Sequence, residues 1–237
     1  MKISVLGIIR NIPVYAAAAI LLPLCGGCDD GRIYEEASSG SSREGSTVRF
    51  SGNLNGTADQ GTDYTVALAG FLPDSEYAEI SKNLTDGEQN LTLTGIPAGV
   101  TSIEVCLLNS IRKRVVTFAS MNLEGDAEIS TFDAGKLSVS QFDAIQTGIL
   151  TPSCERCHGA GGHAAAGLSL LLGESHDQLV GVPSRVMDGL MRVSPGHPEE
   201  STLWLAVGSG ESDSWAFSHR ELLTPERREL ILSWISR

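Results

Sequence analysis

The amino-acid sequence predicts two folded domains, an all-β sandwich followed by an all-α domain. Between residues 47 and 135, short runs of alternating apolar and polar residues are separated by turn signals, which is the pattern of antiparallel strands. From about Ser138 the apolar residues recur at helical spacing instead. A chain of 237 residues also has the length for two small domains rather than one.

Residues 1–27 are expected to be an export signal that is removed from the mature protein. Lys2 and Arg10 precede an apolar run over residues 12–24, and small residues follow it. Two prolines interrupt the run, which is also short for a membrane-spanning helix. We therefore expect an exported protein of the bacterial cell envelope, facing the periplasm or the cell surface.

A pair of cysteines closes this segment and resembles a bacterial lipobox, in which the new N-terminal cysteine is lipidated. Cys28 is the expected acceptor because the small residue Gly27 precedes it, and Cys25 is the alternative. Residues 28–46 are polar and rich in serine and glycine, so they cannot bury a core and are expected to form a flexible tether. The resemblance implies attachment to a membrane through the lipid.

Residues 47–135 are expected to form the β-sandwich. Six or seven short strands are indicated by the runs at residues 48–50, 64–68, 91–93, 103–105, 115–118 and 128–132. Residues 90–99 resemble the strand and turn of carboxypeptidase-regulatory-like and transthyretin-like sandwiches, which implies an immunoglobulin- or transthyretin-like fold. Lys82, Arg112, Lys113 and Arg114 are expected on a solvated strand edge or turn, with a docking patch as the alternative.

Residues 136–237 are expected to form the helical domain. Phe142, Ile145 and Ile149 fall on one face of a helix. Near the other end, Thr224 is suited to cap a helix that has Pro225 at its first position.

The first of these helices leads into a Cys-x-x-Cys-His motif at residues 154–158. This is the attachment pattern of c-type haem. Two residues between the cysteines let both thiols reach the two vinyl groups at one porphyrin edge from a single helical turn, and the adjacent imidazole can then bind the iron. Cys154 and Cys157 are therefore expected to carry one covalent haem c, with His158 as the proximal iron ligand.

Three other interpretations of the motif are less well supported. A structural zinc site needs two more Cys or His ligands at a second knuckle, whereas only isolated histidines follow. A thioredoxin-like redox pair continues into a helix, whereas residues 159–162 read Gly-Ala-Gly-Gly. The third alternative is chance. Cys106 lies between apolar residues and is expected to be a buried thiol without a role.

Three separated motifs over residues 140–237 resemble a group of exported bacterial mono-haem cytochrome domains of class I. They are the segment 149–158 followed by Gly-Leu-Ser-Leu at 167–170, the Arg-Val-Ser-Pro-Gly-His-Pro run that begins segment 192–203, and the Leu-Thr-x-Glu helix with Trp234 and Ile235. The resemblance implies an all-α class I cytochrome c domain and an electron-transfer protein rather than an enzyme.

The second axial ligand is where the chain departs from that group. Such domains usually carry a Met-Pro before the final helix, but residues 215–222 contain no methionine. His219 lies 61 residues after His158, about the interval at which a class I cytochrome brings its distal ligand, and is the expected ligand. The alternatives are Met191 or Met187, and another histidine or an open position on the iron.

The charge of the chain limits its partners. The formal net charge is −12, and loss of Lys2 and Arg10 with the signal makes it −14, which disfavours nucleic acid. The sequence predicts a lipid-anchored electron carrier for redox proteins of the envelope, with the sandwich as a spacer or docking module. The alternative is a surface binding or assembly protein with a structural or gas-sensing haem, and a peroxidase-like enzyme has less support.

Overall fold

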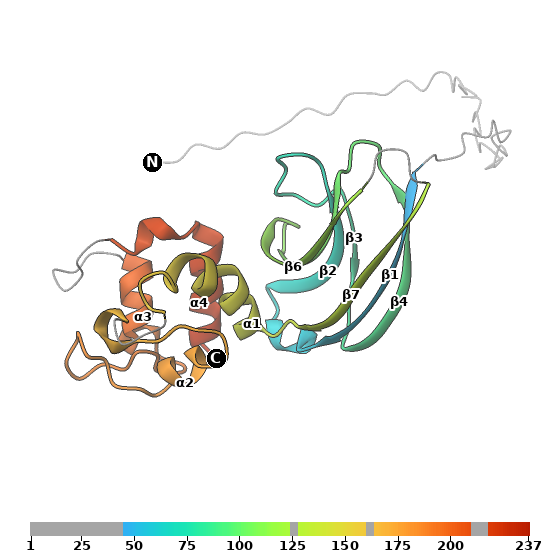
Figure 1. Cartoon of the computed structure of the whole chain (residues 1–237). Helices are drawn as coiled ribbons and strands as arrows, with labels where there is room; N and C mark the ends of the chain where they lie inside the picture. The colour runs from blue at the N-terminus through green and yellow to red at the C-terminus, as the bar shows by residue number, and fades with distance from the viewer. Residues whose placement is uncertain (1–44, 124–127, 160–163, 210–217) are drawn as a thin grey trace, which may run out of the picture. The chain divides into compact units, whose positions relative to one another are not determined.

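The computed structural model describes residues 45–123, 128–159, 164–209 and 218–237, and these belong to one compact unit (Figure 1). The predicted signal, the predicted lipidation sites Cys25 and Cys28, and nearly all of the predicted tether lie outside the described residues. No helix in the described ranges is long and apolar enough to cross a membrane.

Seven strands in the described part form two sheets (Figure 1). They are β1 (Ser46–Asn55), β2 (Tyr64–Phe71), β3 (Ile80–Asn83), β4 (Gly87–Ile96), β5 (Ser102–Asn109), β6 (Arg114–Asn122) and β7 (Ile129–Ser138). The first sheet has the order β4-β1-β7, in which β1 is antiparallel to β4 and parallel to β7. The second has the order β3-β2-β5-β6 and is antiparallel throughout.

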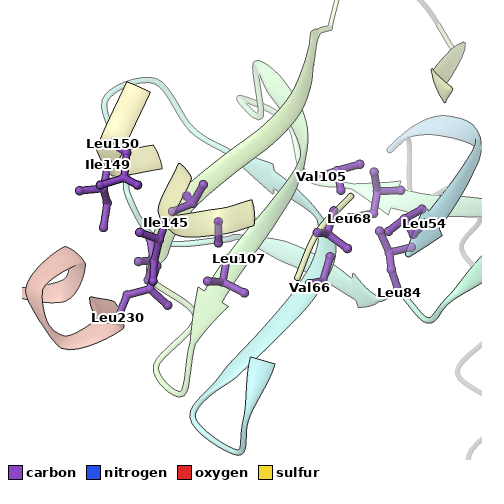
Figure 2. Close-up of a cluster of buried hydrophobic side chains, with 14 of the residues drawn as sticks. Leu54, Val66, Leu68, Leu84, Val105, Leu107, Ile145, Ile149, Leu150 and Leu230 are labelled. Carbon is purple, nitrogen blue, oxygen red and sulfur yellow. The ribbon is translucent and has the colours of Figure 1, made fainter. Parts of the chain in front are cut away.

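One buried apolar cluster contains side chains from both sheets (Figure 2). Val48 and Phe50 of β1, Val66 of β2 and Val105 of β5 are each at most 2% exposed. These residues alternate along their strands with residues on the opposite face, because successive side chains of a strand point to opposite sides of the sheet. The alternating sequence pattern is what lets the two sheets bury a common core.

The remainder of the chain consists of short helices joined by turns and isolated β-bridges. The α-helices are α1 (Gln141–Ile145), α2 (Ser175–Leu179), α3 (Thr202–Trp204) and α4 (Pro225–Ile235). Segments η2 (Gln146–Cys154) and η5 (Leu205–Ser209) are π-helical. Single 3₁₀ turns form η1 (Thr57–Gln60), η3 (Ala165–Gly167), η4 (Pro198–Glu200) and η6 (Arg220–Leu222).

This architecture corrects the fold class expected from the sequence. Strands account for 38% of the structure and helices for 28%, and no large all-α domain is seen in the described residues after β7. The longest α-helix there, α4, has 11 residues. The expectation of an all-α class I cytochrome c domain over residues 136–237 is therefore wrong.

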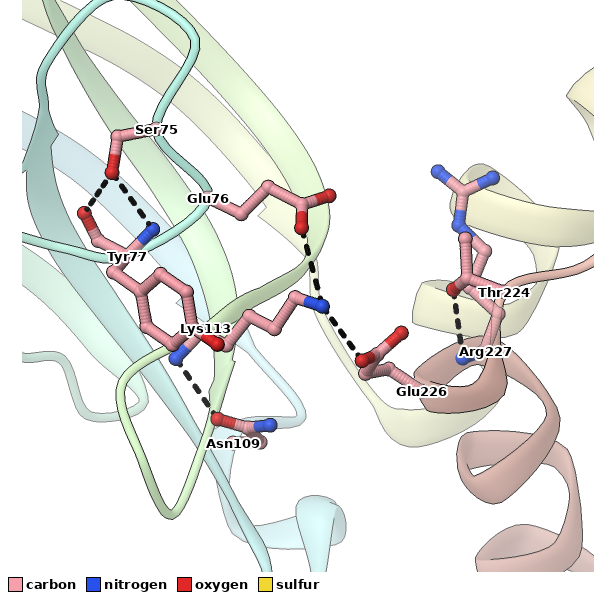
Figure 3. Close-up of polar contacts among 8 residues, drawn as sticks. All are labelled: Ser75, Glu76, Tyr77, Asn109, Lys113, Thr224, Glu226 and Arg227. Carbon is pink, nitrogen blue, oxygen red and sulfur yellow. Dashed lines mark hydrogen bonds and ion pairs between the residues drawn. The ribbon is translucent and has the colours of Figure 1, made fainter.

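Glycine and proline explain why the helical spacing does not extend into long helices. The run that begins at α1 becomes π-helical and contains Pro152, which removes a backbone donor. Five later glycines adopt a positive φ, which ends regular helix. They are Gly167, Gly173, Gly181, Gly189 and Gly196. The helix capped by Thr224 forms as predicted, with the Thr224 hydroxyl accepting a hydrogen bond from the backbone N–H of Arg227 (Figure 3).

The buried cluster of the sheets continues into the helices. Ile145 of α1, Ile149 of η2 and Leu230 of α4 belong to it and are fully buried (Figure 2). Gly148 of η2 lies against Val116 of β6 so closely that an added Cβ would be 2.5 Å from a valine methyl. The segment that leads into the Cys-x-x-Cys-His motif is thus packed directly on a strand.

A polar contact joins the same two regions (Figure 3). The ammonium of Lys113, which directly precedes β6, lies 2.7 Å from a carboxylate oxygen of Glu226 in α4 and 3.2 Å from one of Glu76. Neighbouring Arg114 pairs with buried Glu104 and lies 4.6 Å from the ring centre of Phe71. The sequence had suggested a solvated strand edge or turn for Lys113 and Arg114. In the structure each of them pairs with a carboxylate.

Replacing Gly148 by alanine tests the packing of η2 on β6. Gly148→Ala should lower the free energy of unfolding by about 1–3 kcal/mol, because overpacking costs more than the improved helix propensity returns. Urea unfolding measures this change. In a Val116→Ala background, Gly148→Ala should lower the free energy of unfolding much less, because the valine methyl groups that the added Cβ would meet are absent. Equal losses in the two backgrounds would show that the contact is absent.

The Lys113 contact predicts a stability that depends on pH. The hydrogen bond from Lys113 lowers the pKa of Glu226 below its usual 4.5, and those to Glu226 and Glu76 raise the pKa of Lys113 above its usual 10.5. The contact therefore stabilises the fold fully between the usual pKa values of the two groups. This stabilisation is lost as the pH falls through the lowered pKa of Glu226 or rises through the raised pKa of Lys113.

Lys113→Met should reduce the free energy of unfolding at neutral pH and have no such effect at either extreme. Urea unfolding across the pH range measures it. Lys82→Met, which removes an exposed lysine of β3, is the matched control and should show no such profile. A loss in Lys113→Met that does not vary with pH contradicts the assignment.

Candidate functional site

A cavity of about 280 Å³ opens beside the Cys-x-x-Cys-His motif. Its walls are mostly apolar and come from η2, the turn after it, η3, α2, α3, η5 and η6. The lining residues are Ser153, Cys154, Cys157, His158, Ala165, Ala166, Leu168, Leu170, Leu179, Ser184, Arg185, Val186, Arg192, Thr202, Leu203, Ala206, Val207, His219 and Leu222. A mostly apolar hollow with a few convergent polar groups is the usual form of a cofactor site.

The motif forms one turn at the end of η2. The backbone N–H groups of Cys157 and His158 both donate to the carbonyl of Cys154, at 3.1 and 3.0 Å. This turn brings two thiols and an imidazole to the same side of the cavity. Burial, with the neighbouring Cys157, raises the pKa of the Cys154 thiol to about 11.

A second loop fixes the orientation of His158. Its Nδ1 lies 3.0 Å from the carbonyl oxygen of Ala165, so the neutral ring donates its Nδ1 proton there and keeps Nε2 free to bind a metal. The backbone of the motif is tied to the same loop, since Ala165 donates to Cys157 and Leu170 donates to His158 at 3.0 and 2.6 Å. An imidazole held by a carbonyl in this way is a typical metal ligand.

His219 faces His158 across the cavity. The two ring centroids are 6.4 Å apart and the ring planes are inclined by 34°. Imidazole nitrogens bind metals at about 2 Å, so two imidazoles on opposite sides of one metal ion hold their nitrogens about 4 Å apart. The ring centroids then lie one ring radius further out on each side, which corresponds to the observed separation.

Hydrogen bonds to the main chain hold the segment around His219. The guanidinium of Arg228 in α4 donates to the carbonyls of Arg220 and Leu223, at 3.1 and 2.8 Å. The side chain of Arg220 donates to the carbonyl of Gly208 at the end of η5. The segment is thus fastened to α4 on one side and to the cavity wall on the other.

The alternative ligands considered from the sequence do not line this cavity. Met187 is half-buried elsewhere, and Met191 is 37% exposed with its backbone in β-bridges to Pro183 and Ser201. His176 packs on the rings of Phe142 and Trp234. His197 is exposed beside Glu199. Among the four histidines in the described ranges, His158 and His219 are the two that the fold brings together.

A buried glutamine links the walls of the site and was not singled out from the sequence. Gln146, 2% exposed, donates to the Thr151 hydroxyl at 3.0 Å and to the Leu170 carbonyl at 3.1 Å, and it accepts from the Ser175 hydroxyl. It therefore ties η2 to the loop that holds His158 and to α2. A polar residue between Ile145 and Ile149 on a helical apolar pattern was the available signal.

Sequence reasoning also did not identify two arginines that line the cavity, Arg185 and Arg192. Arg192 opens the second of the three motifs that resemble mono-haem cytochromes, so its position was visible in the sequence. Its burial to 7% exposure was not.

The chain matches no protein-family model, no curated protein and no solved structure.

Gln146 and Gln141 provide a matched test of this polar link. Both side chains are at most 2% exposed, but Gln141 makes one hydrogen bond, to Ser233, and its Oε1 accepts none from the described residues. Gln146→Leu should lower the free energy of unfolding by about 1–3 kcal/mol more than Gln141→Leu, because it leaves several buried polar groups without partners. Urea unfolding compares the two. Equal losses would mean that the bonds of Gln146 add nothing to burial.

Proposed function

We propose that the chain is a mono-haem c-type cytochrome that carries electrons at the bacterial cell envelope. The observation that carries the proposal is the pair of imidazoles, His158 and His219, whose ring centroids face each other at 6.4 Å across an apolar cavity. Cys154 and Cys157 line the same cavity, in the spacing that attaches haem through two thioethers. The donor set and the hollow both fit a haem.

In this proposal each residue has a stated role. Cys154 and Cys157 would hold the porphyrin covalently, and His158 and His219 would bind its iron. The Ala165 carbonyl supports His158 by taking its Nδ1 proton, which strengthens the ring as a ligand. When bound, the haem supplies one-electron redox chemistry.

Two axial imidazoles favour an electron carrier over the other functions considered. If His158 and His219 both bind the iron, no position would be left for a gas or a peroxide. Imidazole donates more strongly than a thioether, so the reduction potential should be lower than with histidine–methionine ligation. A gas sensor or a peroxidase requires a free or readily displaced sixth ligand.

The setting of the carrier is proposed from the sequence. Cys28, or Cys25 in its place, would carry the lipid, and residues 28–46 would tether the folded part near redox proteins of the envelope. The packing of η2 on β6 and of Lys113 on Glu226 supports a sandwich that holds the haem-binding part firmly, so the two would move together on the tether.

Optical spectra of the exported full-length protein, with and without carbon monoxide, test the proposal. The wild type should show covalently bound, low-spin haem that does not react with the gas. His219→Ala should keep the haem but convert it to a high-spin form that binds carbon monoxide. Met187→Leu/Met191→Leu, the control, should match the wild type.

Two results would contradict the proposal. A wild type with high-spin haem that readily binds carbon monoxide would favour a sensor or an enzyme. A spectral change in the methionine double variant, with none in His219→Ala, would move the distal ligand to a methionine.

A further inference from the structure

Two guanidinium groups meet at one backbone residue in the wall of the cavity. Arg192 donates from Nη2 to the Gly167 carbonyl at 3.1 Å, and from Nη1 to the carbonyl and side-chain oxygens of Gln178 at 2.8 and 3.1 Å. Arg185 lies against the other side of Gly167, where an added Cβ would collide with its Nη1. Both arginines line the cavity.

Neither cation has an acidic partner among the described residues. No ion pair between described residues includes Arg185 or Arg192, and none of the described lining residues is Asp or Glu. This is unexpected in a chain with 29 acidic residues against 17 basic ones. Burial, and the nearby charge of Arg185, lower the pKa of Arg192. Arg192 is thus a buried cation with a like charge nearby and, among the described residues, no counter-ion, which is unfavourable.

A purely structural role explains only part of this arrangement. The three hydrogen bonds of Arg192 go to uncharged oxygens, so a neutral donor would serve the same purpose. Arg185 is exposed and, among the described residues, donates none of the side-chain hydrogen bonds. What the two share is a positive charge directed at the same cavity. An anion with two negative groups, or two anions, would complete the site.

We infer that Arg185 and Arg192 bind the two propionate carboxylates of the haem. The inference rests on the proposed function and adds to it the group that orients the porphyrin. A haem is an apolar disc with two carboxylates at one edge, which matches an apolar cavity with a dicationic end. Guanidinium groups pair with carboxylates through two parallel hydrogen bonds, so they fix orientation as well as charge.

The reduction potential of the iron reports this contact. The Arg192 cation keeps its propionate partner ionised and offsets its charge. Without the cation, the carboxylate would favour the ferric iron and its pKa would rise. The potential should then fall at high pH and rise as the pH decreases, because a protonated propionate no longer stabilises the ferric state.

The experiment compares the exported, full-length wild type with four variants, by redox titration between about pH 5 and 8. Arg192→Gln and Arg185→Gln should each shift the ferric-to-ferrous ratio at fixed potential about tenfold at high pH, which equals 59 mV for one electron. Both should also show a steeper dependence on pH. Arg192→Lys should retain most of the wild-type profile. Arg49→Gln, which removes an exposed charge from β1, should change the ratio less than twofold.

The outcomes separate this inference from the proposed function. A wild type without bound haem would overturn both. Haem that is bound in every variant with unchanged potentials and pH profiles would overturn the inference alone, and leave the arginines as structural supports. If Arg192→Gln fails to fold, Arg185→Gln still decides, since the Arg185 side chain is exposed and makes no ion pair or side-chain hydrogen bond with the other described residues.

Discussion

The site is arranged around one pair of imidazoles, His158 and His219, which are 61 residues apart in the chain and have their ring centroids 6.4 Å apart. Neither histidine is held by a long helix. The Ala165 carbonyl orients His158. The side chain of Arg228 donates to the carbonyls of Arg220 and Leu223, and so holds the segment that contains His219 against α4. The precision of the pair therefore comes from hydrogen bonds to the backbone. Such bonds hold loops in place where helix packing is not available, and they account for a site of this geometry in a part of the chain made of short helices and turns.

The sheets provide what those short helices lack. A small segment with many turns buries little apolar surface of its own and is marginally stable alone. Here Ile145, Ile149 and Leu230 join the same buried cluster as the strands, and Gly148 lets η2 contact Val116 directly. The β-sandwich thus supports the part of the chain that carries the Cys-x-x-Cys-His motif, and the two regions share one core. A substitution in β6 should therefore alter the packing of η2 and, through it, the position of the motif.

Local patterns in the sequence predicted local features well. The alternating runs fall within strands, the Thr224 cap forms, and the 154–158 motif makes a single turn. What could not be predicted depends on contacts distant in the chain. The parallel pairing of β1 with β7 joins residues about 80 positions apart in the chain. Lys113 contacts Glu226, which is 113 residues further along. The expected all-α domain failed because the glycines with positive φ divide the chain into turns, an effect that apolar spacing does not register. The sequence showed Arg192 as part of a motif. Only the structure showed that it is buried and that no Asp or Glu is among the described residues that line the cavity.

We propose that one iron lies between His158 and His219. X-ray absorption at the iron edge of the purified, exported protein tests it most directly, because nitrogen and sulfur neighbours scatter differently. The expected spectrum shows six nitrogen neighbours at about 2 Å, four from the porphyrin and two from imidazoles, with no sulfur. A sulfur neighbour, a coordination number of five, or a protein without iron would contradict it.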